Sequence, residues 1–592
     1  MAKRITPTLP ICLMVLLFLA SCSDVDLPGG SETATPNSKS EWTMLGGDLA
    51  STFHNRAEQK ISPENVGQLR KHWEFKPAAQ ANGTPAIVDG VVYATSNGGS
   101  YALDADSGQV LWQNLDLRAT SSPTFDDGSL FIHGVRGDLA RLDAGTGAVV
   151  WTTRSDENPF TSGYSSPTVV DRYVIIGVSS NEEGTAASDA TFRGAVVAFD
   201  RETGERLWRH DTAVAPYNGV GVWSTVTIDM ETRRVFATSG NNYTGQAGPA
   251  SDAIFALDLD TGDSIWTTQL TEGDVFTVLN ARGPDSDFGT NPTLFEVESN
   301  GVTRRMLGAG QKSGVFWALD RDTGEVVWET PLTSGSELIG GVLNNGAYDG
   351  ERILVASNER STGDGTLFAL DPATGSVLWQ QPLASWVWAP ITIANQVAFV
   401  ATSDQMRAYD VANGEELFAF PSEGTITSGA AVADGRVYFG SGMAYIVGAP
   451  TSRVYALSLP GDDPGPAPEP TRTPDAGDAT FTVVYEEIFV GSGCASGSCH
   501  GANAGRLPLA TQREAYDALV GVIARGEACG VLPTLGTSWI RVDPGNPDGS
   551  LLYDKVASAQ PICGDRMPIS SALDPAQVEL IRGWIGAGAL NN

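Results

Sequence analysis

The stretch FALDLDTGDSIW, from Phe255 to Trp266, decides the fold of this chain because the chain repeats it. In each copy an apolar strand end runs into an Asp, a tight turn closes on a Gly, and a second strand ends in an aromatic residue. Further copies lie at Tyr101–Trp112, Arg141–Trp151, Ala198–Trp208, Trp317–Trp328 and Phe368–Trp379, with a decayed copy at Ala408–Phe418. Asp and Gly suit tight turns, and a large aromatic ring can seal the gap between neighbouring units. The repeat therefore predicts stacked structural units, and the phrase itself is first of all architecture.

Short β-branched or alternating runs accompany each phrase, which predicts four strands per unit and an all-β propeller. Seven phrases and a last strand at Val454–Leu457 predict eight blades, and seven blades is the alternative count. The segment around Lys71–Phe75 is expected to pair into the last blade and close the ring, which removes exposed strand edges. The middle units are longer than the units at either end, and long loops on a rigid scaffold are where function concentrates.

The composition limits the classes of partner. The 592 residues include 37 basic and 70 acidic side chains, a net charge of −33. A chain of this length exceeds one ordinary domain, but a repeat array can hold most of it in one body. The strong negative charge argues against nucleic acid and against anionic lipid surfaces as partners.

Residues 1–22 resemble a bacterial lipoprotein signal. Lys3 and Arg4 supply its charge, Ile11–Ala20 is an apolar run too short to span a membrane, and the run ends in LASC. The resemblance implies cleavage before Cys22 and lipidation of that residue; ordinary signal cleavage, with Cys22 incidental, is the alternative. Ser23 follows instead of Asp, which in enteric-type sorting favours the outer membrane. We expect a protein of the Gram-negative cell envelope, on the periplasmic side or the cell surface, attached to the membrane through its lipid anchor only.

The rest of the chain divides into four predicted parts. Residues 23–40 are a flexible tether, 41–460 the propeller, 461–479 a Pro-rich linker, and 480–592 a small all-α domain. Helices are expected at Val483–Gly491, at Arg513–Ile523 with an apolar face of Tyr516, Leu519 and Ile523, and at Pro575–Ala587 with a cap near Asp574.

The C-terminal domain contains the sequence CASGSCH, from Cys494 to His500. Two thiols before a His can anchor a haem by thioether bonds, with the imidazole as an axial ligand. The domain resembles a class I cytochrome c, and more closely the exported bacterial variant with four residues between Cys494 and Cys499. The resemblance implies that His500 and Met567 hold the iron of a c-type haem.

Cys529 and Cys563 remain, and we expect a disulfide between them because export permits one. Two alternatives stay open. One is a domain with two disulfides and no haem, and the other is a zinc site, which is the weaker because the CxxC pairs of zinc ribbons are absent.

The long middle units of the propeller carry Gly219–Ser224, Ser239–Tyr243, Asp285–Gly289 and Gly310–Asp320. With the opening WTMLGGD (Trp42–Asp48), these stretches resemble the quinoprotein alcohol dehydrogenases, specifically the polyvinyl-alcohol dehydrogenase branch. The resemblance implies that pyrroloquinoline quinone (PQQ) lies on the propeller axis.

The same resemblance implies a role for each matching residue. PQQ would stack on Trp223, which could otherwise be a blade-core Trp, while Asp287 would act as general base and Lys312 would bond the quinone. A Ca²⁺ ion would polarise the quinone and prefer oxygen ligands.

The implied calcium ligands are Glu183, Asn241 and Asp287. The neighbouring Glu182 is the alternative to Glu183, and Asn242 is the alternative to Asn241. The expected cofactors are therefore PQQ, Ca²⁺ and haem c.

One feature departs from the family pattern, which places two adjacent Cys over the other face of the quinone. The corresponding place here reads Ser188-Asp189-Ala190, and the predicted propeller has no Cys. We expect an exported quinohaemoprotein that oxidises an alcohol or polyol and passes electrons through haem to an external cytochrome or quinone pool. The alternative is a non-catalytic propeller scaffold that carries an electron-transfer haem.

Overall fold

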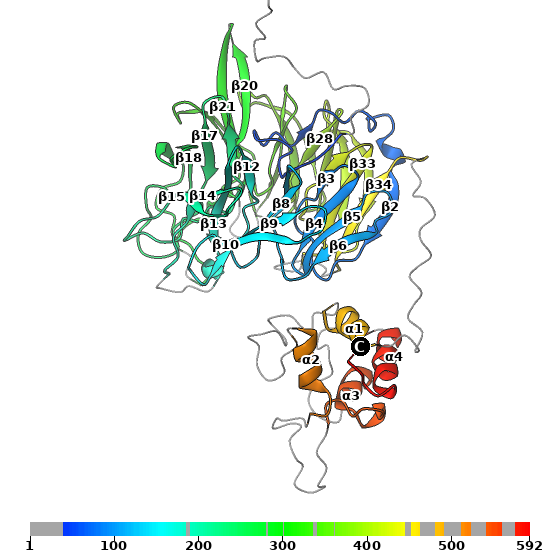
Figure 1. The fold of residues 1–592 in the computed structure, drawn as a ribbon. Helices are drawn as coiled ribbons and strands as arrows, with labels where there is room; N and C mark the ends of the chain where they lie inside the picture. The colour runs from blue at the N-terminus through cyan, green and yellow to red at the C-terminus, as the bar shows by residue number, and fades with distance from the viewer. Residues whose placement is uncertain are drawn as a thin grey trace, which may run out of the picture. The chain divides into compact units, whose positions relative to one another are not determined.

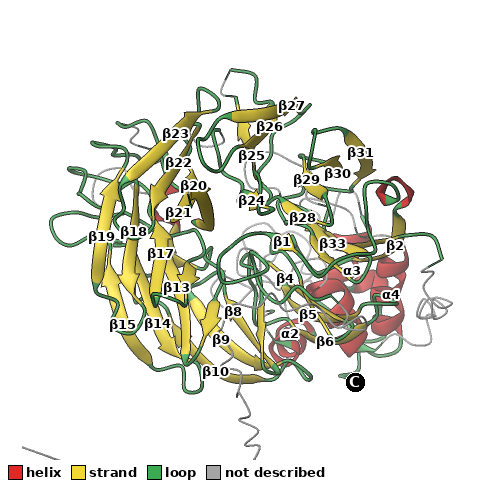
Figure 2. Ribbon diagram, turned by 90° about the horizontal axis from the view of Figure 1, so that it is seen from above, coloured by secondary structure: helices red, strands yellow, loops and turns green. Residues whose placement is uncertain are grey.

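The computed structural model describes residues 40–184, 190–279, 282–299, 301–335, 340–359, 361–443, 451–461, 480–490, 509, 511–522, 540–558, 573 and 575–591. Within these residues eight sheets, each built on four antiparallel strands, stand radially round a central axis (Figures 1 and 2). The eight-bladed propeller is therefore confirmed, and the count of seven blades is wrong.

Blades 1 to 4 follow the chain in order. Blade 1 contains β3 (Ala86–Val88), β4 (Val91–Ser96), β5 (Gly99–Asp104) and β6 (Val110–Asn114), and blade 2 contains β7 (Thr124–Asp126), β8 (Ser129–His133), β9 (Asp138–Asp143) and β10 (Val149–Arg154). Blade 3 contains β11 (Thr161–Ser162), β12 (Thr168–Val170), β13 (Tyr173–Ser180), β14 (Ala195–Asp200) and β15 (Arg206–Asp211). Blade 4 contains β16 (Thr227–Asp229), β17 (Arg234–Thr238), β18 (Ala253–Asp258) and β19 (Ser264–Gln269).

Blades 5 to 8 complete the ring. Blade 5 contains β20 (Thr293–Ser299), β21 (Val302–Gly310), β22 (Val315–Asp320) and β23 (Val326–Pro331), and blade 6 contains β24 (Ala347–Tyr348), β25 (Ile353–Asn358), β26 (Gly365–Leu370) and β27 (Val377–Pro382). Blade 7 contains β28 (Thr392–Ala394), β29 (Val397–Ala401), β30 (Gln405–Asp410), β31 (Glu416–Pro421) and the short strand β1 (His54–Asn55). Blade 8 contains β32 (Ala431–Ala433), β33 (Arg436–Ser441), β34 (Arg453–Ser458) and β2 (Arg70–Phe75). Two short 3₁₀ turns, η1 (Val66–Gln68) and η2 (Asn181–Gly184), lie between strands.

The Trp of the repeated phrase joins neighbouring blades. Trp112 donates its indole N–H to the carbonyl of Ala144 in the next blade at 2.8 Å. Its ring covers Gly147, where a Cβ would lie only 2.5 Å from a ring carbon, so the turn of the next blade needs a glycine there. Equivalent indole bonds are made by Trp73, Trp151, Trp208, Trp266, Trp328 and Trp379.

The ring closes through the first long strand of the chain. β2 pairs antiparallel with β34, from Arg70 opposite Ser458 to Phe75 opposite Val454. The last blade thus takes its outer strand from the N-terminal side, as the sequence predicts, and β34 is covered by β2.

A segment that we call the strap (residues 42–55) crosses the axis and hydrogen-bonds to seven of the eight inner strands. Its backbone carbonyls accept from Ile87, Phe125, Ile228, Leu294, Tyr348 and Ile393 at 2.7–2.9 Å, and the Asn55 amide donates to Val432 at 2.7 Å. Because these partners belong to blades 1, 2, 4, 5, 6, 7 and 8, the strap ties the ring together at one end of the axis.

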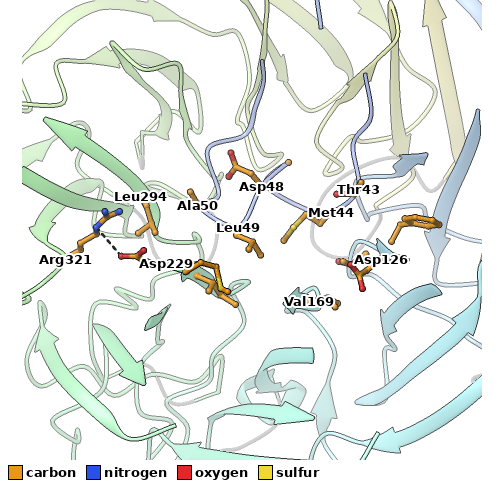
Figure 3. A pocket seen from close by; sticks show the side chains of 15 residues that line it. Thr43, Met44, Asp48, Leu49, Ala50, Asp126, Val169, Asp229, Leu294 and Arg321 are labelled. Atoms are coloured by element: carbon orange, nitrogen blue, oxygen red, sulfur yellow. Dashed lines mark ion pairs between the residues drawn. The ribbon is translucent and has the colours of Figure 1, made fainter. Parts of the chain in front are cut away.

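A cavity of about 630 Å³ lies beside the strap. In Figure 3 Met44 and Leu49 of the strap lie between Val169 and Leu294 of the inner strands, whereas the Asp48 side chain points away from Val169. On its wall Arg321 and Asp229, both almost fully buried, form an ion pair of 3.6 Å.

The C-terminal part of the chain is helical. It contains α1 (Phe481–Val483), η3 (Val484–Val490), α2 (Gln512–Leu519), η4 (Pro547–Gly549), α3 (Leu551–Ala557) and α4 (Pro575–Gly586). Its core includes Phe481 packed on Trp584, with ring centroids 4.9 Å apart. None of the described helices is long and apolar enough to cross a membrane.

The second predicted helix is shorter than the sequence suggests. Thr511 caps α2 by accepting from the Glu514 N–H, as Ser and Thr do at helix starts. The helix ends at Leu519 because Val520 adopts an extended conformation and forms a bridge with Val542. Tyr516 and Leu519 do reach the core, whereas Ile523 and the predicted cap Asp574 lie outside the described residues.

Candidate functional site

A cavity of about 700 Å³ lies on the axis, at the opposite end of the inner strands from the strap. Every blade contributes to its lining. The contributing side chains, one from each blade in order, include Asn82, Thr120, Ser180, Trp223, Asp287, Leu343, Trp388 and Thr427. A volume of this size is typical of a pocket for a small-molecule cofactor or substrate.

The charged centre of this cavity is a lysine between two aspartates. Lys312 Nζ lies 2.7 Å from Asp285 Oδ1 and 3.1 Å from Asp287 Oδ2. The three side chains are between 0% and 8% exposed, so their charges interact with little screening by water. The Lys312 N–H also donates to the Asp287 carbonyl at 3.0 Å, which fixes the two residues by backbone as well as by side chain.

Asn241 stands beside this centre with an unused acceptor. Its backbone N–H donates to Asp287 Oδ1 at 2.5 Å, and its side-chain amide donates to the carbonyls of Asn242 and Phe276 at 2.6 and 2.8 Å. The remaining side-chain oxygen is buried and has no hydrogen-bond partner among the described residues. A buried acceptor without a partner is costly, so this oxygen is suited to a ligand such as a cation.

The alternative residue Asn242 has its side chain fully engaged. Its oxygen accepts from the Gly248 N–H and its amide donates to the Asn218 carbonyl, both at 2.6 Å. Asn242 therefore holds the loop, and Asn241 is the residue whose side-chain oxygen has no partner among the described residues.

The structure also separates Glu182 from Glu183. The Glu182 carboxylate accepts backbone N–H groups of Thr191 and Phe192 at 2.7–3.0 Å and is buried in the loop. Glu183 lines the cavity instead, and its carboxylate lies with those of Asp285 and Asp287 in a cluster whose ligand atoms are all within 4.8 Å of one another. Three carboxylates at this spacing suit a hard cation.

The proximity of these groups shifts their proton affinities. Burial, and then the Asp287 charge, raise the pKa of Glu183 to about 8, although Lys312 opposes the shift. Burial also raises the pKa of Asp287. Burial alone would lower the pKa of Lys312, but Asp287 and Asp285 outweigh it and hold that pKa above its ordinary value. The lysine is therefore charged, and the carboxyls are poised to exchange a proton for a cation.

Trp223 supplies an aromatic wall. Its half-exposed ring lines the cavity, and the Lys312 ammonium lies 5.7 Å from the ring centroid. The rim of the ring lies against Gly289, where a Cβ would come within 2.1 Å of it. The interpretation of Trp223 as a blade-core residue is therefore wrong, because the ring faces the cavity.

Sequence reasoning missed two acidic groups. Asp285 lies in the stretch Asp285–Gly289, and the family resemblance implies no role for it, although it makes the shorter contact with Lys312. Asp274 accepts the Ser286 N–H at 2.6 Å and shapes that stretch; burial raises its pKa to about 6. The Asp-x-Asp spacing was the signal available for Asp285, whereas nothing local in the sequence marks Asp274.

The other predicted site residues lie outside the described residues. They are Cys22, Cys494, Cys499, His500, Cys529, Cys563 and Met567. Ser188 and Asp189, at the place of the family's Cys pair, lie outside them too.

Comparison with known sequences finds two family profiles and a set of similar dehydrogenases. A family profile described as "Glucose/ethanol/alcohol dehydrogenase, beta-propeller domain" matches residues 42–124 and 153–334, and one described as "Outer membrane protein assembly factor BamB" matches residues 311–462. A polyvinylalcohol dehydrogenase of Pseudomonas sp. is 28% identical over 65% of this chain and 70% of its own length. A second one, from Sphingopyxis sp. (strain 113P3), is 28% identical over 71% and 73%.

Solved structures share the fold. A quinohemoprotein alcohol dehydrogenase from Comamonas testosteroni superposes with a TM-score of 0.60 at 18% identity, over 92% of this chain and 95% of its own. A europium-containing methanol dehydrogenase gives 0.60 at 17% identity, over 71% and 98%. The chain thus carries a PQQ alcohol dehydrogenase-like β-propeller, and the sequence similarity suggests an oxidoreductase.

Proposed function

We propose that the axial cavity oxidises an alcohol or polyol with PQQ and Ca²⁺. The observation that carries the proposal is that Glu183, Asn241, Asp287 and Lys312, which come from three consecutive blades, meet at one point of the axis beside Trp223. A hydrogen-bonded carboxylate and a buried ammonium are costly to place in a scaffold that performs no chemistry.

The residues present fit a calcium ion. Glu183 and Asp287 would supply carboxylate oxygens, Asp285 lies within the same cluster, and the partnerless Asn241 oxygen would supply a neutral ligand. Lys312 would face the quinone edge with its charge, and Trp223 would support the planar ring system.

When bound, PQQ would supply the two-electron oxidant that takes a hydride from the alcohol carbon. Asp287 would take the hydroxyl proton, because its carboxylate lines the cavity and its raised pKa makes it a stronger base than an ordinary carboxylate. The backbone N–H of Asn241 and the ammonium of Lys312 hold that carboxylate in one orientation.

We further propose that electrons leave through a covalent haem c in the C-terminal domain. The support is the order of Cys494, Cys499, His500 and Met567 in the sequence, followed by a last helix. From that haem they would pass to an external cytochrome or the quinone pool. The chain would be a lipid-anchored protein of the Gram-negative cell envelope, and the support is the signal that ends at Cys22.

The test is a double variant, Glu183→Gln with Asp287→Asn, assayed for dye-linked alcohol oxidation with PQQ and Ca²⁺ supplied. We expect loss of oxidation with the fold retained. Full activity in this variant would sink the proposal. A haem stain after denaturing electrophoresis tests the haem separately, because a thioether-bound haem survives and a disulfide does not stain.

A second candidate function is a non-catalytic scaffold with an electron-transfer haem. The match of residues 311–462 to the assembly-factor profile favours it, as does the absence of Cys from the propeller sequence. Calcium-dependent binding of PQQ to the full chain separates the two, since a scaffold has no use for it.

A further inference from the structure

Two buried residues just after Asp287 link the separate strands that carry the site. Thr290 and Asn291 are 2% and 3% exposed, and they lie where the Asp287 loop enters β20. Neither side chain lines the cavity. Their hydrogen bonds run outward to the strands on both sides.

Thr290 connects the strands of Lys312 and Asn241. Its hydroxyl is within 2.9 Å of both the carbonyl and the N–H of Gly310, two residues before Lys312. Its carbonyl accepts from the Thr238 hydroxyl at 2.9 Å, and Thr238 stands three residues before Asn241. The Thr238 hydroxyl is also 2.6 Å from that of Ser224, which follows Trp223.

Asn291 connects the strand of Trp223 with the strap. Its side-chain oxygen accepts from the Thr225 N–H at 2.9 Å, two residues after Trp223. Its amide donates to the Ser51 hydroxyl of the strap at 3.2 Å, and its backbone N–H donates to the Asn345 oxygen of blade 6 at 2.6 Å.

Other blades carry a simpler version of this link. Where inner strands begin, a backbone N–H in one blade donates to a side-chain oxygen of the next, as from Thr84 to Ser122, from Ser122 to Ser166 and from Ser166 to Thr225. Blade 5 differs because the Asn291 amide also reaches the strap at Ser51. The bonds of Thr290 have a counterpart in blade 2, where Ser121 donates to the His133 carbonyl and accepts from Thr95.

We propose that Thr290 and Asn291 are positioning residues, which fix Trp223, Asn241, Asp287 and Lys312 relative to one another across blades 4 and 5. The inference rests on the proposed function where it concerns calcium and the quinone. Each of the four site residues lies within four positions, along the chain, of Thr290 or Asn291 or of a residue bonded to them. Loss of one of these bonds therefore moves a calcium ligand or the general base Asp287. Small displacements of this kind are enough to weaken a metal site and to slow a reaction.

The test compares Thr290→Val with Thr392→Val. Both threonines are fully buried near the start of an inner strand, and the hydroxyl of each donates to a backbone carbonyl. The Thr392 hydroxyl, in blade 7, donates to the Ala430 carbonyl of blade 8 at 2.7 Å. Calorimetric Ca²⁺ titration of the full chain should show affinity lowered by about tenfold to a hundredfold in Thr290→Val. Affinity should be unchanged in Thr392→Val and restored in Thr290→Ser, which keeps the hydroxyl. Equal Ca²⁺ affinities in the two valine variants would overturn the proposal.

Crystal structures of the ligand-free variants provide a second test, which does not depend on calcium binding. Thr290→Val should move Lys312 Nζ away from Asp287, and Thr392→Val should leave that 3.1 Å contact in place. An unmoved Lys312 in Thr290→Val would overturn the positioning role. A wild-type chain that binds neither Ca²⁺ nor PQQ would instead overturn the proposed function, while these structures would still decide the role of Thr290.

Discussion

The backbone N–H of Asn241 donates to Asp287 Oδ1 at 2.5 Å, although the two residues are 46 positions apart. The contact places a neutral oxygen donor and a carboxylate at one point of the axis. Their arrangement has consequences for calcium affinity, for its pH dependence and for the binding of a planar cofactor.

Calcium affinity is expected to rise with pH up to about 8. Burial and Asp287 raise the pKa of Glu183 to about 8, so Ca²⁺ must displace a proton from it at lower pH. The affinity should fall by about tenfold for each pH unit below that value. Calorimetry in buffers of different ionisation enthalpy measures the released proton. An affinity that stays flat from pH 6 to 8, with no proton released, would contradict the assignment of Glu183.

The same shift makes the calcium-free protein less stable as pH rises. Between the ordinary pKa of 4.5 and about 8, folded Glu183 keeps a proton that the unfolded chain has lost, so its contribution falls across that window. Denaturant unfolding at several pH values should show this decline, and Glu183→Gln should flatten it. If the unfolding free energy of wild type, relative to that of Glu183→Gln, instead increased with pH, the pKa of Glu183 would not be raised.

Replacement of Asn241 by Ala should weaken Ca²⁺ binding by at least about tenfold, because it removes the oxygen that has no other partner. Asn242→Ala is the matched control. Its oxygen and amide both bond the backbone, so it should lower the melting temperature with little effect on Ca²⁺ affinity. The reverse pattern in calcium titrations would assign the ligand to Asn242.

Gly289→Ala should reduce PQQ affinity more than Ca²⁺ affinity. The added methyl group would come within 2.1 Å of the Trp223 ring and displace it, and its three nearest neighbours all belong to that ring and not to the carboxylate cluster. Gly145→Ala, in an exposed turn where the nearest atom is 3.5 Å away, is the control. Equal PQQ affinities in the two variants, measured by quinone absorbance, would mean that Trp223 does not support the cofactor.

Trp208→Phe should destabilise the propeller without changing the site. It removes the indole bond to the Leu259 carbonyl at 3.0 Å while keeping most of the ring, so we expect a loss of about 1 kcal/mol in unfolding free energy. Urea unfolding and calcium titration of the same preparation check both parts. A change in calcium affinity with no loss of stability would show that the Trp of the repeated sequence has a role beyond joining neighbouring blades.

Much of the fold could be read from the sequence because its signals are local and repeated. The turn and its Trp recur in order, and Lys71–Phe75 pairs into the last blade as expected. The strap could not be read in this way. Its partners, from Ile87 to Val432, are scattered along the whole propeller, and backbone carbonyls carry no residue signature.

The site shows a similar limit. Resemblance singles out Trp223, Asp287 and Lys312, which line the axial cavity, and Asn241, which bonds Asp287, but it leaves Glu182 and Glu183 as alternatives. These neighbours lie in one tight turn, η2, and only the loop at Thr191 decides which carboxylate turns inward to the backbone. Asp285 was missed because its role depends on the three-dimensional position of Lys312.

The most direct test of the central claim is titration of the full-length chain with PQQ in the presence and absence of Ca²⁺. The account predicts stoichiometric binding that requires Ca²⁺ and is lost in Glu183→Gln. Binding that is absent from the wild type, or that is indifferent to both Ca²⁺ and Glu183, would contradict it.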